Sequence, residues 1–511
     1  MMSASRLLRR ARLAVFSLCL LGPALAWAVT GPVESFGGRR QAEFPEVADV
    51  IGPGAEARAQ LTDAVLDRSW LRRTALGLRS GFDFFLFGQA DQDNAVSGLD
   101  GWLFYRPQFE AWNCEAVDQV RDGLEALRFQ SEFAAAGDLP VLFAIAPNKA
   151  SVERDRVGGR AAREMDACYD QVEADLRRMT REDQTGRLVD HTALLQNLDS
   201  PERRFYRYDT HWQPWAALEA FNQLAGHPVY PSGLPLEHPQ FETVRQRPDI
   251  ARRILALPVT EAAEYPVVSP VNWDETEERA RFASIVVSHD SFYGSIRDIL
   301  EARMAAPVLV HQGLPEMPDL SEALAEADLL IVERVERHLH DQFGRWAEVG
   351  GEAAIHAWLL ERSALAARRC AWDEALDLMP GGTAAEADFR RMENLAAGGM
   401  QTRAANARIH FTPPAEWGDA PVCVRASVTA TRDEQSWVFV PGALLSDARY
   451  VNGRSLHIPL EEGANEIAFV LPASVAGENL RWDPVRSNRP VTVTALEIAP
   501  RFARDASSQP D

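Results

Sequence analysis

The fold of this chain is decided by the stretch Val286-Val287-Ser288-His289-Asp290-Ser291-Phe292. An apolar run ends in a polar turn, and a helical pattern follows from Phe292 to Met304. A buried strand that turns directly into a helix is typical of α/β proteins, in which parallel strands need crossover connections. Ser291 would lie at the carboxyl end of its strand, where proteins of this class gather their chemistry.

Strand-like and helical segments alternate on both sides of this stretch. The pattern predicts helices from Glu115 to Ala136 and from Arg163 to Thr180. It predicts strands at Val141 to Ala146, Leu188 to Asp190, Phe282 to Val287, Val308 to His311 and Leu329 to Val332. Such alternation predicts a parallel sheet with helices on both faces. We therefore expect an α/β domain over residues 80–345.

The remainder of the chain divides into further segments. Residues 1–28 combine four arginines, an apolar run and small residues, which is the pattern of a signal peptide, with an uncleaved anchor as the alternative. Residues 29–79 are expected to form a leader and an N-terminal helix. Residues 346–405 read as a helical connector and 406–504 as a β-sandwich of short strands separated by turns. The tail, 505–511, is expected to be disordered.

Composition and cysteine count limit the class of protein. The formal net charge of −21 excludes general nucleic-acid binding and opposes long-range attraction of a polyanion. Four cysteines remain outside the signal, and an even set in an exported chain indicates disulfides. We expect neighbours in sequence to pair, Cys114 with Cys168 and Cys370 with Cys423, although four cysteines allow two other connectivities.

Two segments carry residue types that fit nucleophilic catalysis. Ser291 could attack a carbonyl at the start of its helix, while the alternative is that Asp290 or Ser291 only caps that helix. In Tyr208-Asp209-Thr210-His211-Trp212, an extended backbone would place Asp209 and His211 on one side. The carboxylate could then orient the imidazole toward a serine, and the alternative is a core histidine beside a surface acid.

Lys149 is the only lysine among 53 basic residues. It follows the predicted strand Val141 to Ala146 directly, in a loop of the kind that builds sites. Compositional bias that spared one lysine is the alternative to a role in the site. An ammonium there is not interchangeable with a guanidinium.

Four motifs, taken in order, resemble the SGNH-hydrolase-like domain of the alginate O-acetyltransferases AlgJ and AlgX. The motifs are Asp100-Gly101-Trp102-Leu103-Phe104-Tyr105, the segment from Tyr208 to Trp212, the segment from Val286 to Phe292, and Leu329 to Arg337. The resemblance covers roughly residues 80 to 345 and implies an SGNH-like sheet. It implies that Ser291 is the nucleophile, His211 the general base and then acid, and Asp209 its orienter. His289 departs from the glycine of the usual motif.

Further side chains are candidates for substrate or oxyanion contacts, namely Lys149, Asn148, Trp212, His289, Arg334 and Arg337. The downstream β unit resembles the carbohydrate-binding domain of AlgX-like proteins. Its tryptophans Trp417, Trp437 and Trp482 could stack on sugar rings, although tryptophan in a strand is more often core. His338 and His340 lack a third ligand at a recognisable spacing, so we expect no metal and no cofactor.

The resemblance implies an exported, periplasmic O-acetyltransferase that passes acetyl through an acetyl-serine to an alginate-like polysaccharide. It implies a membrane-bound acyltransferase as the source of acetyl. Two alternatives remain open at this stage. One is an O-acetyl esterase with the same triad, and the other is a non-catalytic scaffold that binds polysaccharide.

Overall fold

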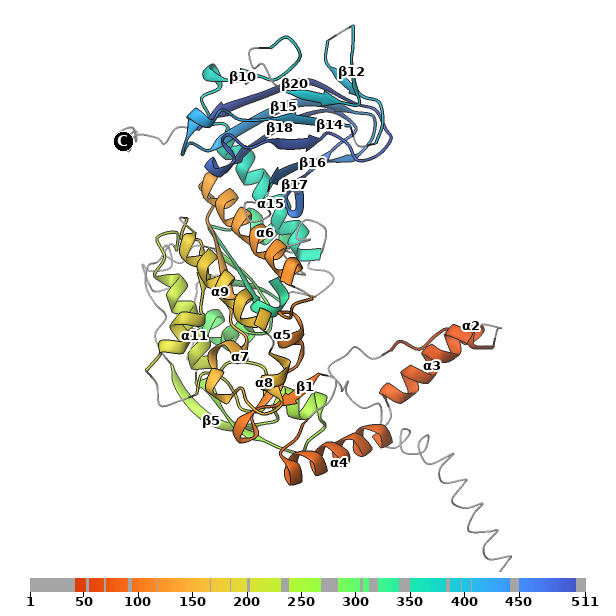
Figure 1. Ribbon diagram of the computed structural model, residues 1–511, viewed down its shortest axis with the longest axis vertical. Coiled ribbons are helices and arrows are strands. Elements are labelled where there is room, and N and C mark those ends of the chain that lie inside the picture. Colours follow the sequence, from red (N-terminus) through yellow and green to blue (C-terminus); the bar gives the residue numbers. More distant parts are fainter. Residues whose placement is uncertain are drawn as a thin grey trace, which may run out of the picture.

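The protein has an α/β unit at one end of its long axis and a β-sandwich at the other (Figure 1). The computed structural model describes residues 42–51, 55–68, 70–90, 94–115, 117–165, 167–183, 185–199, 203–230, 239–267, 284–303, 307–311, 320–339, 350–382, 387–396, 398–405, 407–441 and 450–501. The expected signal peptide and tail lie outside these ranges. Within them, no helix is both long and apolar enough to cross a membrane.

A five-stranded parallel sheet in the order β4-β3-β9-β7-β8 forms the centre of the α/β unit. Its strands are β3 (Val141–Ala146), β4 (Leu188–Asp190), β7 (Ile285–His289), β8 (Pro307–His311) and β9 (Leu329–Val335). All residues of β3, β7 and β9 are buried, so both faces of the sheet are covered. The parallel α/β sheet expected from the sequence is confirmed, although the expected start of β7 at Phe282 lies outside the described residues.

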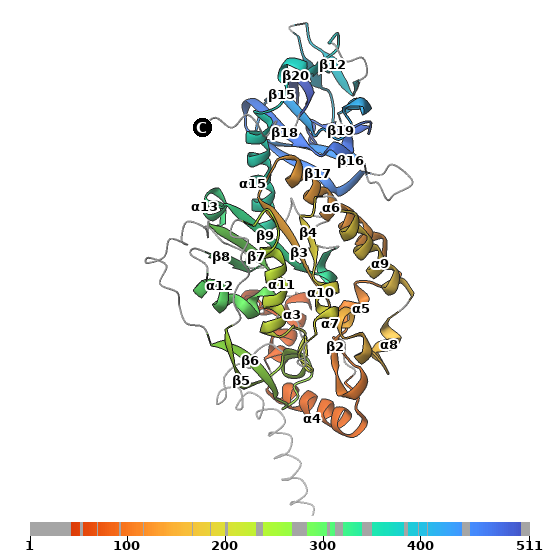
Figure 2. The same cartoon turned by 90° about the vertical axis from the view of Figure 1, so that its left-hand side faces the viewer.

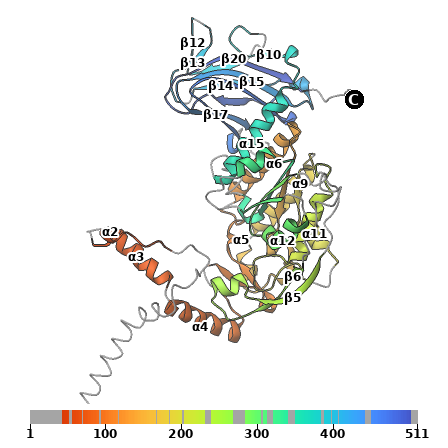
Figure 3. The ribbon, with the colours of Figure 1, turned by 180° about the vertical axis from the view of Figure 1, so that it is seen from behind.

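Helices connect and cover these strands, and α6 and α9 lie side by side (Figure 2). The main ones are α6 (Val117–Ala136), α9 (Ala167–Glu182), α10 (Thr192–Asn197), α11 (Pro214–Ala225), α12 (Arg297–Arg303) and α13 (Leu320–Ala325). Shorter helices are α5 (Pro107–Glu110), α7 (Lys149–Val152) and α8 (Ala161–Glu164). Before the α/β unit come α2 (Val47–Ile51), α3 (Ala55–Asp67) and α4 (Trp70–Phe87), which lie far from the sandwich (Figure 3).

The carboxyl ends of the central strands meet at one edge of the sheet. Ala146 of β3 is paired with Val335 of β9, and Ser288 of β7 with Val332 of β9. The segments that leave β3, β9 and β7 therefore start close together. Ser291 lies two residues beyond the end of β7.

Two antiparallel ribbons outside the parallel sheet lie near this edge. One pairs β1 (Ala95–Ser97) with β2 (Leu103–Tyr105), and the amide of Leu103 donates to the carbonyl of Arg207 at 3.0 Å. The other pairs β5 (Gln240–Gln246) with β6 (Glu261–Val267), with a π-helical turn, η3 (Ile250–Ile254), between them. The sequence patterns did not predict the β5–β6 ribbon. It reaches the site through the segment that joins its two strands.

The C-terminal region is a sandwich of two antiparallel sheets, in the orders β12-β13-β20-β15-β18, with β10 beside β20, and β11-β14-β19-β16-β17. The helical connector expected over residues 346–405 is wrong beyond α15 (Gly350–Ala367), because β10 to β13 all lie in that range. Strands of two or three residues are too short to show a period in the sequence. The strands are β10 (Leu376–Asp377), β11 (Asp388–Arg390), β12 (Met392–Asn394), β13 (Met400–Thr402), β14 (Arg408–Phe411), β15 (Val422–Ala430), β16 (Glu434–Pro441), β17 (Tyr450–Leu460), β18 (Gly463–Leu471), β19 (Leu480–Asp483) and β20 (Val491–Pro500).

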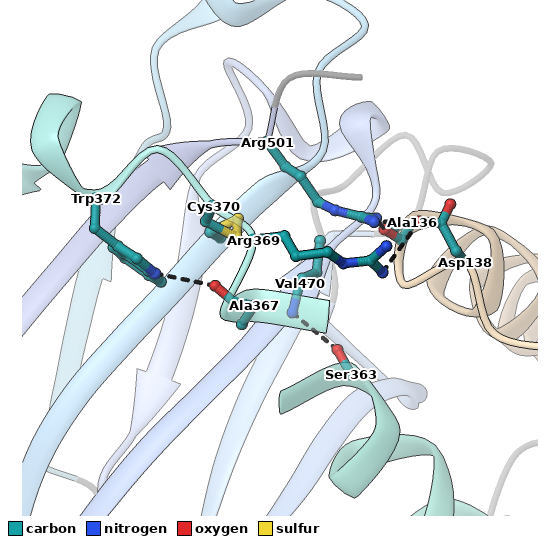
Figure 4. Close-up of a disulfide and its surroundings, with 10 residues drawn as sticks. Ala136, Asp138, Ser363, Ala367, Arg369, Cys370, Trp372, Val470 and Arg501 are labelled. Carbon is teal, nitrogen blue, oxygen red and sulfur yellow. Dashed lines mark hydrogen bonds and ion pairs between the residues drawn. A yellow bond between two sulfur atoms is a disulfide. The ribbon is translucent and has the colours of Figure 1, made fainter. Parts of the chain in front are cut away.

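Disulfides join Cys114 to Cys168 and Cys370 to Cys423. The second ties the segment after α15 to β15 of the sandwich. Figure 4 shows the same region, where Arg369 and Arg501 both reach the carboxylate of Asp138, just after α6. The disulfide therefore fastens the segment after α15 to the sandwich, and the charged contacts at Asp138 hold the two units together.

Candidate active site

Ser291 is exposed and lies in a turn whose backbone is hydrogen-bonded to the carboxylate of Asp290. The Asp290 carboxylate accepts the amide of Phe292 through Oδ1 and the amide of Val335 through Oδ2, both at 2.8 Å. The expected α-helix from Phe292 is wrong at its start, because a 3₁₀ turn over Tyr293–Ile296 precedes α12. Asp290 therefore ties the turn that carries Ser291 to the end of β9, and Ser291 is not the first residue of an α-helix.

His211 connects Ser291 to Asp209. Its Nε2 lies 2.8 Å from Ser291 Oγ, and its Nδ1 lies 2.6 Å from Asp209 Oδ1. The expected extended segment is a series of bends instead, in which Asp209 Oδ1 also accepts the amide of His211 at 3.1 Å. The carboxylate therefore holds both the backbone and the ring of His211. This geometry fits a nucleophile, a base and an orienting acid.

Burial and charge act in opposite directions on this pair. Burial lowers the pKa of His211, but the charge and hydrogen bond of Asp209 and the charge of Asp249 together outweigh burial, and the pKa is raised above its ordinary value. Burial likewise opposes ionisation of Asp209, yet the charge and hydrogen bond of His211 hold the pKa of Asp209 well below its usual range. A permanently ionised Asp209 favours the protonated imidazole that forms when His211 takes a proton.

Comparison with known proteins shows which domain this part of the chain resembles. Residues 95–266 match the family model described as an SGNH hydrolase-like domain of the acetyltransferase AlgX. This part of the chain is similar to that domain. The match includes Asp209 and His211, while Ser291 lies beyond its end.

Individual relatives cover the chain to different extents. The probable alginate O-acetylase AlgJ of Azotobacter vinelandii is 25% identical over 155 residues, which are 30% of this chain and 38% of that relative. Among solved structures, the chain is similar to the O-acetyltransferase domain of Pseudomonas putida AlgJ, with 21% identity, a TM-score of 0.36, and coverage of 48% of this chain and 92% of that one. It is also similar to Pseudomonas aeruginosa AlgX, with 14% identity, a TM-score of 0.32, and coverage of 80% and 95%.

Lys149 lies buried behind the loop that carries Asp209 and His211. Its Nζ donates to the carbonyl oxygens of Leu103, Arg207 and Asp209 at 2.7, 2.9 and 3.1 Å. Burial lowers the pKa of Lys149 to about 8. All three donors of the ammonium are used on backbone carbonyls, so Lys149 supports the loop that carries Asp209 and does not face substrate.

Asn148 and Arg337 lie together at the ends of β3 and β9. Arg337 Nη1 donates to Asn148 Oδ1 at 3.2 Å, and the guanidinium lies 5.3 Å from the ring of Phe292, next to Ser291 in sequence. Asn148 is fully buried, and its Nδ2 has no acceptor among the described residues. An amide donor without an acceptor is suited to stabilising a developing negative charge.

The other three candidates for substrate or oxyanion contacts hold the backbone instead. Arg334 donates to Ser288, His289 Nδ1 contacts the carbonyl of Asp290, and Trp212 Nε1 donates to the carbonyl of Phe292 at 2.8 Å. All three side chains are buried. The expectation of substrate contact is therefore corrected to support of the Ser291 turn, and His289 packs inward without breaking the contact of Ser291 with His211.

Of the three sandwich tryptophans that were candidates for sugar stacking, two are core side chains, which is the alternative given for them. Trp482 is buried and donates to Ser436, while Trp437 is buried between the ring of His457, 3.6 Å away, and the guanidinium of Arg486, 4.0 Å away. Trp417 is half-buried and packs against the core. Stacking on a sugar needs an open ring face. The proposed role is therefore corrected to packing for Trp437 and Trp482.

Sequence reasoning missed Asp249, which lies between β5 and η3. Its Oδ2 is 3.7 Å from His211 Nδ1, and its amide donates to Asp209 Oδ2 at 2.6 Å. No motif marks this residue in the sequence, since it is 40 positions from Asp209. Only the folded ribbon brings it to the site.

Ligand atoms of Asp209, His211 and Asp249 lie within 4.8 Å of one another, a spacing compatible with a metal ion. The 2.6 Å between His211 Nδ1 and Asp209 Oδ1 is a hydrogen-bond distance, which leaves no room for a cation between these two atoms. The arrangement therefore fits a proton-transfer site better than a metal site. His340 of the earlier histidine pair lies outside the described residues.

Proposed function

We propose that this protein is an O-acetyltransferase that carries acetyl on Ser291 and delivers it to hydroxyl groups of an exported, alginate-like polysaccharide. The main support is the hydrogen-bonded series from Ser291 Oγ through His211 to Asp209, with Ser291 exposed. The AlgX-type family match and the AlgJ relative support acetyl as the group that is moved.

In the first half-reaction, Ser291 Oγ attacks the carbonyl carbon of an acetyl donor while His211 Nε2 takes the hydroxyl proton. The tetrahedral intermediate collapses, the bond to the leaving group breaks, and His211 returns the proton to that group. Acetyl-Ser291 and the released donor alcohol or thiol are the products. Asp209 stabilises the imidazolium in both steps.

In the second half-reaction, a sugar hydroxyl attacks the acetyl-serine carbonyl. His211 removes the hydroxyl proton and then donates it to Ser291 Oγ as the ester bond breaks. The sugar leaves as its acetyl ester and the serine is regenerated. Acetyl therefore moves with no net change of oxidation state and without a cofactor.

We propose that Asn148 Nδ2 and Arg337 stabilise the oxyanion of both intermediates. Asn148 has an unused buried donor, and Arg337 holds its carbonyl oxygen so that the donor stays oriented. A donor of this kind contributes about 3 kcal/mol to transition-state binding.

The proposal divides the chain into an AlgX-like catalytic unit over residues 80–345 and a sandwich, formed by β10 to β20, that holds polymer. A periplasmic location needs a donor from another protein, because acetyl-coenzyme A is not supplied there, and a membrane-bound acyltransferase is the proposed source. The disulfides are consistent with an exported protein.

An O-acetyl esterase is the second candidate, because Ser291 is exposed and water could reach an acyl-serine. One experiment separates the two. The protein is incubated with an activated acetyl ester and an oligosaccharide, and sugar-bound acetyl is measured by mass spectrometry. Transfer to sugar supports the transferase, whereas release of acetate alone supports the esterase. If Ser291→Ala retains the wild-type rate of ester cleavage, both assignments are wrong.

A further inference from the structure

The loop that carries Asp209 and His211 is held by charged side chains from separate elements. Lys149 donates to its carbonyls, and Glu261 of β6 accepts the amides of Arg207 and Tyr208 at 2.9 and 3.2 Å. Asp249, from the turn between β5 and β6, contacts the triad itself. The β5–β6 ribbon therefore contributes two carboxylates to the surroundings of His211.

We propose that Asp249 is a positioning residue of the reaction, a second carboxylate that fixes Asp209 and stabilises the imidazolium of His211. This inference rests on the proposed function of Ser291 and His211, and goes beyond it in assigning a role to the β5–β6 ribbon.

The backbone of Asp249 completes the hydrogen bonding of Asp209. Oδ1 of Asp209 faces His211, and Oδ2 accepts the amide of Asp249 at 2.6 Å. With both oxygens engaged, the carboxylate cannot rotate without breaking a charge-assisted hydrogen bond. The orientation of the imidazole therefore depends on the position of the Asp249 backbone.

The side chain of Asp249 accepts two hydrogen bonds from Thr210, the residue between Asp209 and His211. Thr210 donates its amide to Asp249 Oδ1 at 2.8 Å and its hydroxyl to Oδ2 at 2.6 Å. The same Oδ2 lies 3.7 Å from His211 Nδ1, which is too far for a hydrogen bond but close for two charges. Asp249 therefore acts on His211 through its charge and through Thr210.

The charge of Asp249 is sensitive to pH. Burial, together with the charge of Asp209, raises the pKa of Asp249 to about 6. The groups that act on it from all sides are Asp209, Thr210, His211, Lys149, Tyr105 and Arg337. At neutral pH the carboxylate is ionised and raises the pKa of His211, so its removal should lower that pKa.

A purely structural role is the main alternative, because Asp249 Oδ1 also accepts the amide of Ile250 at the start of η3. A structural role predicts loss of stability or of kcat without a change in the pH at which His211 titrates. The pH profile therefore separates the two roles.

The test compares wild type with Asp249→Asn, which keeps the size and one acceptor oxygen but removes the charge. We expect kcat for cleavage of an activated acetyl ester to fall about 10-fold with KM unchanged. We expect the acid limb of the kcat/KM profile to move about one pH unit lower, because a less basic His211 loses its proton at lower pH. Glu242→Gln, an exposed charge removal on β5 of the same ribbon, is the matched control and should leave both unchanged.

Two results would overturn the inference: a wild-type acid limb in Asp249→Asn, with or without a lower kcat, or an equal shift in the Glu242→Gln control. Thermal unfolding of each variant shows whether it is folded at the temperature of the assay. Ser291→Ala is measured alongside. If that variant is active, the proposed function itself fails, whereas an inactive Ser291→Ala beside an unshifted Asp249→Asn removes only the role of Asp249.

Discussion

The ammonium of Lys149 donates to the backbone carbonyl of Asp209 at 3.1 Å, from beneath the loop that carries the triad. This contact gives the only lysine of the chain a physical role. The ammonium is compact and its three donors meet three carbonyls, whereas a planar guanidinium has a larger head with a fixed fork of donors. An arginine would therefore not fit the same cavity.

Replacing Lys149 by methionine should destabilise the protein. The carbonyls of Leu103, Arg207 and Asp209 lose their donor, and nearby buried carboxylates lose a counter-charge, so the free energy of unfolding should fall by about 3 kcal/mol. Urea unfolding measures this difference, with the exposed Arg79→Met as a control. A Lys149→Met variant as stable as wild type would contradict this role.

The rate should depend on the protonation of His211. Since the pKa of His211 is raised above 6.5, the acid limb of kcat/KM should lie above that pH, because the base must be neutral to accept a proton. Asp209→Asn removes the main cause of the raised pKa, so the limb should move to lower pH, and kcat should fall about 10³-fold or more. Stopped-flow or steady-state assays over a range of pH measure both the acid limb and kcat. An acid limb below pH 6.5 in wild type would contradict the raised pKa of His211.

Glu336 should make the protein less stable as pH rises. Burial raises its pKa to about 8, so the folded state holds a proton that the unfolded state releases between roughly pH 4.5 and 8. Stability contributed by that proton is present at low pH and lost as pH rises toward 8. Glu336→Gln should flatten this dependence and be more stable than wild type at pH 8 by on the order of 1 kcal/mol.

Urea denaturation of both proteins at pH 5 and pH 8 gives the comparison for Glu336. The hydrogen bonds to its carboxylate from Asn148 and Ser151 can persist with glutamine, since an acceptor oxygen remains. Parallel pH dependences of the two proteins would show that Glu336 does not titrate in this range.

Removal of the Cys370–Cys423 disulfide should loosen the sandwich without disabling the triad. The bridge closes a separation of 53 residues, so the double serine variant should lose about 2–4 kcal/mol. Ester cleavage should remain near wild type, because neither cysteine contacts the site. Calorimetry measures the loss of stability, and the ester assay measures the activity that remains. The double serine variant of Cys114 and Cys168, the bridge of the α/β unit, is the comparison. Loss of activity at a temperature where the variant is folded would contradict the prediction.

The sequence predicted secondary structure correctly where a pattern is long and depends only on neighbouring residues. Val141–Ala146 is a strand with the bounds expected from its apolar run, because such a run leaves few other structures. The short strands β10 to β13 were assigned to a helical connector, since two or three residues show no period and their pairing with β14 and β20 is set by tertiary contacts.

For the site, the residue types of Ser291, His211 and Asp209 pointed to their chemistry, and the fold brings them together. Asp249 could not be found in this way, because its contacts arise from a ribbon whose strands alternate weakly and are largely exposed. The burial of Trp482 agrees with the alternative that tryptophan in a strand is more often core.

The most direct test is to react the protein with an activated acetyl ester, quench rapidly, and map the acetylated residue by peptide mass spectrometry. We predict one acetyl group, on Ser291, that forms in wild type, disappears when an oligosaccharide acceptor is added, and is absent from Ser291→Ala. Acetyl found on another residue, or equal labelling of Ser291→Ala, would contradict the assignment of Ser291 as the nucleophile.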